Sequence, residues 1–143
     1  MICTFFGHRN TPATTEKLLS EILTDFIKNQ RADEFYVGNQ GNFDAMVRRQ
    51  LEILRKEYNI TYSVVLAYLP DKNTEPIPCS GYPEGIETVP RKFAITYRNK
   101  WMLKKADTVI CYVAHPSSGA GQFVELAEKQ GKRILNLNNY RKY

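Results

Sequence analysis

Three short segments combine glycine with small polar residues, which allows backbone N–H groups to come close to an anion. They are Gly7-His8-Arg9-Asn10, the 38–42 segment GNQGN with Asp44 shortly after it, and the 114–121 segment AHPSSGAG. Glycine lacks the side chain that would hold a ligand away from the backbone, and the start of a helix adds unpaired N–H donors and a favourable dipole. This chemistry suits a phosphate or carboxylate group of a bound nucleotide.

Each segment taken alone has an ordinary alternative, a tight connection from a strand to a helix, and that alternative stays open. Three such segments at corresponding places favour a binding site. The pattern is neither the dinucleotide fingerprint G-x-G-x-x-G with a later acidic residue nor the P-loop G-x-x-x-x-G-K-[ST]. We expect ligand contacts from Gly7, His8, Arg9, Gly38, Asn39, Gly41, Asn42, Asp44, Ser117, Ser118, Gly119 and Gly121.

Arg98 is the most informative single residue, because it lies on the apolar face of a helix predicted over 91–105. Its neighbours three and four positions away are all apolar: Ala94, Ile95, Trp101 and Met102. The solvated stripe of the same helix consists of Lys92, Thr96, Lys100 and Lys104. A guanidinium that packs against a sheet must find a partner, since a buried unpaired charge is costly. Arg98 either contacts a carboxylate or strand-end carbonyls as part of the fold, or holds a ligand phosphate or positions a catalytic carboxylate.

Two further side chains near the ends of predicted strands could act on a ligand. Glu125 lies one turn into the helix that follows Gly121, but it could equally be exposed and paired with Lys129. His8 could serve as a general base or could hydrogen-bond its own loop. For both residues the two readings stay open.

An alternation of strands and helices must position these residues. The chain predicts strands over 2–6, 34–37, 62–69, 108–113 and 133–137. It predicts helices from an N-cap at Thr11 to about 27, over about 91–105 and from the glycine-containing turn to about 130. A further amphipathic helix has Asp44 in its first turn and is marked by Met46, Val47, Leu51, Leu54 and Tyr58. This alternation predicts an α/β fold, a doubly wound, mainly parallel Rossmann-like sheet of about five strands with helices on both faces. In such sheets ligands bind beyond the carboxyl ends of the strands, where the strand order reverses.

Length and composition set the outer limits. The chain has 143 residues, of which 43% are hydrophobic and 24% are charged. This length and composition predict one domain over 1–143. Five of the seven prolines fall in a loop at about 70–90, which is either a functional lid or a surface excursion.

The sequence has no apolar run long enough to span a membrane, and its N-terminus does not have the layout of a signal peptide. Three cysteines without C-x-x-C spacing argue against disulfides and thiolate zinc sites and favour the cytoplasm, and we expect neither a metal nor a cofactor. Cys3 and Cys111 are expected in the core.

The positive charge is concentrated in the C-terminal part. Residues 1–89 hold nine Lys and Arg against twelve Asp and Glu, whereas residues 90–143 hold eleven against three. This favours an anionic partner near Arg98 or a basic outer face on its helix. We expect Lys100 and Lys104 to be solvated surface, which leaves Arg98 as the strong candidate.

The opening G-H-R-N and the 35–44 stretch FYVGNQGNFD resemble small bacterial and phage members of the SLOG superfamily, which joins the Lonely Guy (LOG) enzymes with the Rossmann domain of DNA-processing protein A. Arg98, Met102 and Asp107 have the spacing of the LOG signature R-K-x-x-M-x-x-x-x-D, and Gly119, Gly121 and Glu125 match its P-G-G-x-G-T-x-x-E part. Asn99, Ser117, Ser118 and Gln122 depart from it, and about four extra residues precede the glycine turn. The resemblance implies a phosphate-binding turn at Gly119 and Gly121, and Arg98 and Glu125 as the pair that cleaves an N-glycosidic bond. Many SLOG domains are nucleotide sensors, and the enzymes are often dimers, so a homodimer is an expectation.

Three functions follow as hypotheses. The favoured one is binding of a small nucleotide or phosphoribosyl ligand without turnover. The first alternative is a LOG-like phosphoribohydrolase that cleaves a nucleoside 5′-monophosphate, with Arg98 and Glu125 as catalytic residues. The second alternative, which we do not favour, is a nucleic-acid-binding module. It is motivated by the excess of basic over acidic residues.

Overall fold

A computed structural model describes residues 1–140, so the last three residues of the predicted domain lie outside the described part. The fold is α/β, and all strand pairings of its six-stranded sheet are parallel. The strands are β1 (Ile2–Gly7), β2 (Glu34–Val37), β3 (Thr61–Val65), β4 (Ser80–Gly81), β5 (Thr108–Tyr112) and β6 (Arg133–Asn136). The α-helices are α1 (Thr15–Asn29), α2 (Gly41–Arg55), α3 (Ala94–Lys105) and α4 (Gly119–Lys129), with short 3-10 turns at Ile86–Thr88, Arg91–Phe93 and Leu137–Asn139.

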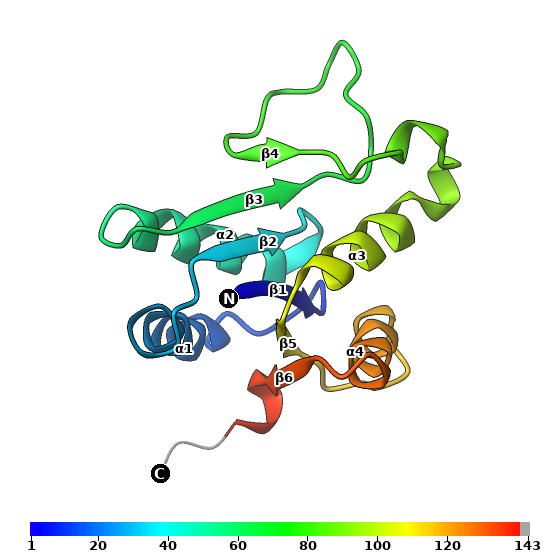
Figure 1. Ribbon diagram of the computed structural model, residues 1–143. Coiled ribbons are helices and arrows are strands. Elements are labelled where there is room, and N and C mark those ends of the chain that lie inside the picture. Colours follow the sequence, from blue (N-terminus) through cyan, green and yellow to red (C-terminus); the bar gives the residue numbers. More distant parts are fainter. Residues whose placement is uncertain (141–143) are drawn as a thin grey trace.

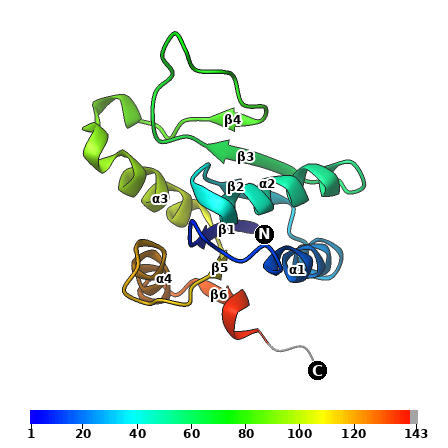
Figure 2. The ribbon, with the colours of Figure 1, turned by 180° about the vertical axis from the view of Figure 1, so that it is seen from behind.

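The sheet is doubly wound, as the sequence predicts. The strand order is β4-β3-β2-β1-β5-β6, so the order reverses between β1 and β5. Helices α1 and α2 cover one face, and α3 and α4 cover the other (Figures 1 and 2). The carboxyl ends of β1 and β5 therefore mark the switch point at which such sheets bind ligands.

Each face of the sheet buries its own apolar cluster. Apolar residues of α1 and α2 pack with alternate residues of the central strands, such as Phe5, Phe35 and Ile110. On the other face Met102 of α3 and Ala127 of α4 pack with Phe6 and Val109. Successive residues of a strand point to opposite faces, so Phe5 and Phe6 belong to different clusters. Cys3 and Cys111 are fully buried, which confirms the prediction of core thiols, and burial raises the pKa of each to about 12.

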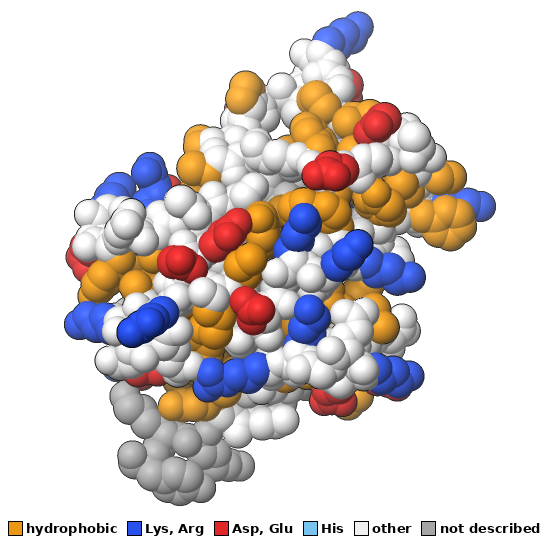
Figure 3. All heavy atoms as spheres, in the orientation of Figure 1, with side chains coloured by type: hydrophobic (Ala, Val, Ile, Leu, Met, Phe, Trp, Pro, Cys, Tyr) orange, Lys and Arg blue, Asp and Glu red, His pale blue; other side chains and the backbone are white. Residues whose placement is uncertain are grey.

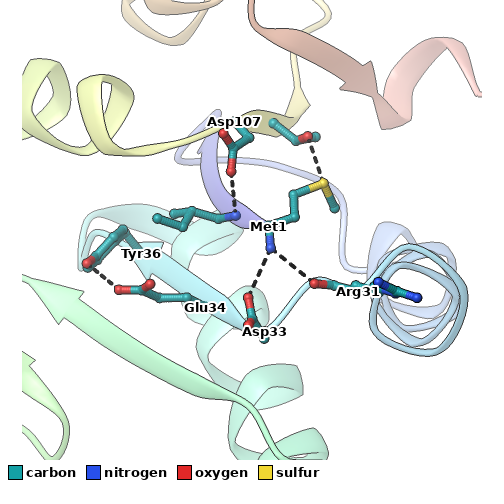
Figure 4. A network of polar contacts seen from close by, with 8 residues as sticks. Met1, Arg31, Asp33, Glu34, Tyr36 and Asp107 are labelled. Carbon is teal, nitrogen blue, oxygen red and sulfur yellow. Dashed lines mark hydrogen bonds and ion pairs between the residues drawn. The ribbon is translucent and has the colours of Figure 1, made fainter.

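Polar contacts tie the amino ends of β1, β2 and β5 together (Figure 4). The Met1 amine lies 3.0 Å from Asp33 Oδ1, and the N–H of Ile2 donates to Asp107 Oδ2 at 2.9 Å. The Tyr36 hydroxyl donates to Glu34 at 2.6 Å. Asp107, part of the LOG-like spacing, thus holds the edge of the sheet opposite the switch point.

The proline-rich loop contains a strand that the sequence does not reveal. Ser80 and Gly81 form β4, a two-residue edge strand paired in parallel with Val64 and Val65 of β3. The rest of the loop projects from the sheet at the top of Figures 1 and 2. A strand this short has no periodicity to detect, which explains why the sequence predicts about five strands and the fold has six.

Two predicted boundaries are wrong. Helix α1 begins at Thr15, not after an N-cap at Thr11, because the Thr11 hydroxyl donates back to the His8 carbonyl at 2.7 Å. Strand β3 ends at Val65, whereas an apolar run to residue 69 predicts a longer strand. The Leu66 N–H still donates to the Gly81 carbonyl at 2.8 Å, and Leu66 and Ala67 stay buried, so the apolar run reflects packing that continues beyond the strand. Within residues 1–140, no helix is long and apolar enough to cross a membrane.

Candidate functional site

A cavity of about 770 Å³ opens at the switch point, and we call it the switch-point cavity. The end of β1, the start of α2, one side of α3 and the first turns of α4 form its walls. Its apolar floor includes Phe6, Met102 and Phe123. Its polar lining consists of His8, Arg9, Asn10, Gln40, Asp44, Thr96, Arg98, Asn99, Lys100, Ser118 and Gln122. This volume lies in the range of small-molecule sites.

Arg98 is buried against the sheet, as the sequence predicts, with 2% of its surface exposed. Its Nη1 donates to the carbonyl of Val65, the last residue of β3, at 2.9 Å, and lies 3.5 Å from Asn39 Oδ1. Its Nε donates to Asn99 Oδ1 at 2.8 Å. Burial lowers the pKa of Arg98, and the charge of Asp44 opposes that change. The strand-end carbonyl contact expected as the structural alternative is therefore present, and Arg98 also lines the cavity.

Asp44 supplies a buried carboxyl group to the same cavity. Its Oδ2 accepts the N–H of Gln40 at 3.0 Å, which closes the first turn of α2. Burial raises its pKa to about 6, against the lowering effects of that hydrogen bond and of the positive charges of Arg98, Arg48 and Arg9. Asp44 therefore titrates well above an ordinary aspartate.

Gly38 lies between these two charged groups. A Cβ atom at position 38 would lie 2.8 Å from Asp44 Oδ2 and 2.9 Å from Arg98 Nη1. Gly7 and Gly41 are also explained by packing, because a Cβ atom would meet the Phe43 ring and the Arg9 backbone respectively. These three glycines let side chains and loops approach one another.

His8 joins the ends of β1 and β5 across the switch point. Its Nε2 accepts the N–H groups of Ala114 at 2.9 Å and His115 at 3.3 Å, so the ring carries its proton on Nδ1 when it is neutral. Burial, together with the nearby His115 ring at 5.3 Å, lowers the pKa of His8. His8 therefore binds a loop, but it is the loop after β5 and not its own loop after β1.

The first turn of α4 presents backbone donors to the cavity. Ser118 caps the helix, its Oγ accepting the N–H of Gly121 at 3.1 Å, and the first intrahelical bond runs from Gln122 to the Ser118 carbonyl. The N–H groups of Gly119 and Ala120 precede that bond, so the helix itself offers them no acceptor. Both residues line the cavity. Gly121 faces away and packs against the chain, since a Cβ atom there would lie 2.2 Å from the Pro116 carbonyl oxygen.

The predicted site residues divide into two groups. Those that line the switch-point cavity are Gly7, His8, Arg9, Asp44, Arg98, Ser118 and Gly119. Those placed outside its lining are Gly38, Asn39, Gly41, Asn42, Ser117, Gly121 and Glu125. Glu125 is 64% exposed and pairs with Lys129 at 3.4 Å, which is the alternative reading from the sequence.

The cavity also has polar lining that the sequence reasoning missed. Gln40, Asn99, Lys100 and Gln122 all line it. Lys100 is exposed, as predicted for the solvated stripe, yet it stands at the cavity rim because α4 lies across from it. On the face seen in Figure 3, Lys and Arg side chains gather over α3. In the described part of the chain, no three His, Cys, Asp or Glu side chains form a group that could hold a metal ion.

In comparisons with known proteins, no protein-family model and no curated protein matches this sequence. The site must therefore be interpreted from its own geometry.

Proposed function

We propose that this chain binds a nucleotide or a nucleotide-derived ligand in the switch-point cavity. The observation that carries the proposal is the joint placement of cationic side chains and free helix-start N–H groups around one cavity. Arg9, Arg98 and Lys100 line it, with Asp44 as an opposing charge, and the N–H groups of Gly119 and Ala120 lie at its edge. An anionic group is stabilised both by this charge and by the N-terminus of α4.

The chemistry favours binding over hydrolysis by the Arg98–Glu125 pair. A catalytic carboxylate must come within hydrogen-bond reach of the reacting atoms. Glu125 is exposed, paired with Lys129 and outside the cavity lining. The family-derived assignment of Glu125 as a catalytic residue therefore lacks geometric support.

The test is isothermal titration calorimetry with the four common nucleoside 5′-monophosphates and with ribose 5-phosphate. Lys100→Gln removes a charge at the cavity rim, and Lys104→Gln removes the same charge one turn further along the exposed stripe of α3. We expect at least one phosphate ester to bind, and Lys100→Gln to weaken it about three- to tenfold. Lys104→Gln serves as the matched control and should bind as the wild type does. Equal weakening by both variants, or no binding of any ester, would contradict the proposal.

A further inference from the structure

A second cavity, of about 430 Å³, lies beneath the proline-rich loop, and we call it the loop cavity. Its walls come from the chain between Leu66 and Tyr82, together with Asn39 after β2 and Arg91 before α3. It opens at the carboxyl ends of β2 and β3, the same edge of the sheet as the switch-point cavity.

Asn39 connects the walls of the two cavities. It lines the loop cavity, and its Oδ1 lies 3.5 Å from Nη1 of Arg98 and 3.5 Å from Nε2 of Gln40, which both line the switch-point cavity. Neighbouring strands are about 4.8 Å apart, so cavities centred two strands apart are separated by roughly 10 Å. One mononucleotide is long enough to reach from one to the other.

Arg91 lies over an aromatic ring in the wall of the loop cavity. Its guanidinium carbon lies 4.0 Å from the centre of the Tyr68 ring, a cation–π contact that holds the group against the ring. Among residues 1–140, no acceptor receives a hydrogen bond from this guanidinium. The free guanidinium face and N–H edges suit a planar group that carries acceptor atoms.

The charges of the loop cavity do not suit a second phosphate. Arg91 is its cation, and Asp71 and Glu75 are its anions, so the net charge of the lining is negative. Exposed apolar surface accompanies them, since Leu69 is 54% and Tyr82 37% exposed. A flat, uncharged heteroaromatic ring would cover this apolar surface and stack on the open face of the Arg91 guanidinium.

We infer that the loop cavity binds the heteroaromatic base of the ligand whose phosphate lies in the switch-point cavity. This inference rests on the proposed function and adds a specificity-determining residue, Arg91, to it. The base stacks on the guanidinium that Tyr68 supports, and the proline-rich loop forms the outer wall of the base site.

The experiment compares ligands that share the phosphoribosyl group and differ in the base. Calorimetry measures the affinity of the four nucleoside 5′-monophosphates and of ribose 5-phosphate for the wild type, Arg91→Gln and Lys92→Gln. Lys92 is the matched control, because it is the next residue of the same 3-10 turn, is also exposed, and lies outside both cavities. We expect the preferred monophosphate to bind at least about tenfold more tightly than ribose 5-phosphate, and Arg91→Gln to remove most of that preference. Ribose 5-phosphate should bind all three proteins equally.

The outcomes separate the two proposals. Failure of every phosphate ester to bind the wild type overturns the proposed function and this inference with it. Binding of ribose 5-phosphate as tightly as every monophosphate overturns the base site alone. Equal loss of both ligand types in Arg91→Gln also overturns it, since that result indicates general electrostatics rather than contact with the base.

Discussion

Asp44 and Arg98 face each other across Gly38, so close that a Cβ atom at position 38 would lie 2.8 Å from Asp44 Oδ2 and 2.9 Å from Arg98 Nη1. One residue comes from the start of α2 and the other from the middle of α3, helices on opposite faces of the sheet. Gly38 follows β2 and leaves the space in which the two charges interact. The carboxyl edge of the sheet thus holds a buried pair of opposite charges whose members both line the switch-point cavity.

Gly38→Ala should test the importance of this spacing. The new methyl group must displace two buried polar side chains, so we expect a loss of about 1–3 kcal/mol in the free energy of unfolding, measured by urea denaturation. Gly81→Ala is the control, because its Cβ atom would meet only Ser63 Oγ at an ordinary 3.9 Å. If the two variants have the same free energy of unfolding, Asp44 and Arg98 do not approach Gly38 as closely as described.

The raised pKa of Asp44 predicts a specific dependence of stability on pH. The folded protein holds the Asp44 proton up to a pKa of about 6, whereas an ordinary aspartate releases it at 3.8. Between these values the folded state binds more protons than the unfolded state, so the contribution of Asp44 to stability falls as the pH rises. Asp44→Asn keeps an acceptor for the Gln40 N–H and removes the titration. The stability of the wild type minus that of Asp44→Asn should fall by about 2 kcal/mol between pH 4 and pH 6. A difference that stays constant over this range contradicts the buried carboxyl group.

The glycines at the start of α4 should behave differently from each other. Gly121→Ala places a methyl group 2.2 Å from the Pro116 carbonyl oxygen, so the turn must open. We expect a loss of about 1–3 kcal/mol in the free energy of unfolding and weaker binding of phosphate esters. Gly119→Ala meets nothing within 4 Å and should keep the stability of the wild type. Equal destabilisation of both variants is the result that this geometry does not allow.

Replacement of Glu125 separates binding from hydrolysis. The residue is exposed and makes one surface ion pair, with Lys129. We expect Glu125→Ala to change the free energy of unfolding by less than about 0.5 kcal/mol and to leave ligand binding unchanged. Incubation of the wild type with nucleoside monophosphates should release no free base on chromatography. Base release that Glu125→Ala abolishes would restore the hydrolase reading.

Helical spacing was sufficient to find Arg98, because the residues three and four positions away define one face of one helix. The same argument missed Lys100, since its position at the cavity rim depends on α4, which packs across from α3. Likewise, the cavity is lined by one side of α4 and its N-cap, and Glu125 lies outside that lining. The lining residues there are Ser118, Gly119, Ala120, Gln122, Phe123 and Leu126. Spacing within one element predicts a face, but the cavity arises from contacts between elements distant in the sequence.

The loop between β3 and α3 is the part of the fold that the sequence predicts least well. Its prolines indicate an irregular segment, and the structure adds a two-residue strand and a cavity beneath it. The cation–π contact of Arg91 with the Tyr68 ring joins residues 23 positions apart. No local pattern records that contact, because it depends on how the whole loop folds back over the sheet.

The most direct test of the proposed function locates the ligand on the protein. Titration of the ¹⁵N-labelled chain with the tightest-binding nucleoside monophosphate, followed by two-dimensional NMR, reports on every backbone amide. We expect the largest shifts at Gly119, Ala120 and Gln40 around the switch-point cavity, and none at Ile2 or Asp33 at the opposite edge of the sheet. Saturable shifts confined to the switch-point and loop cavities would support the account. Shifts centred elsewhere, or no shifts with any nucleotide, would contradict it.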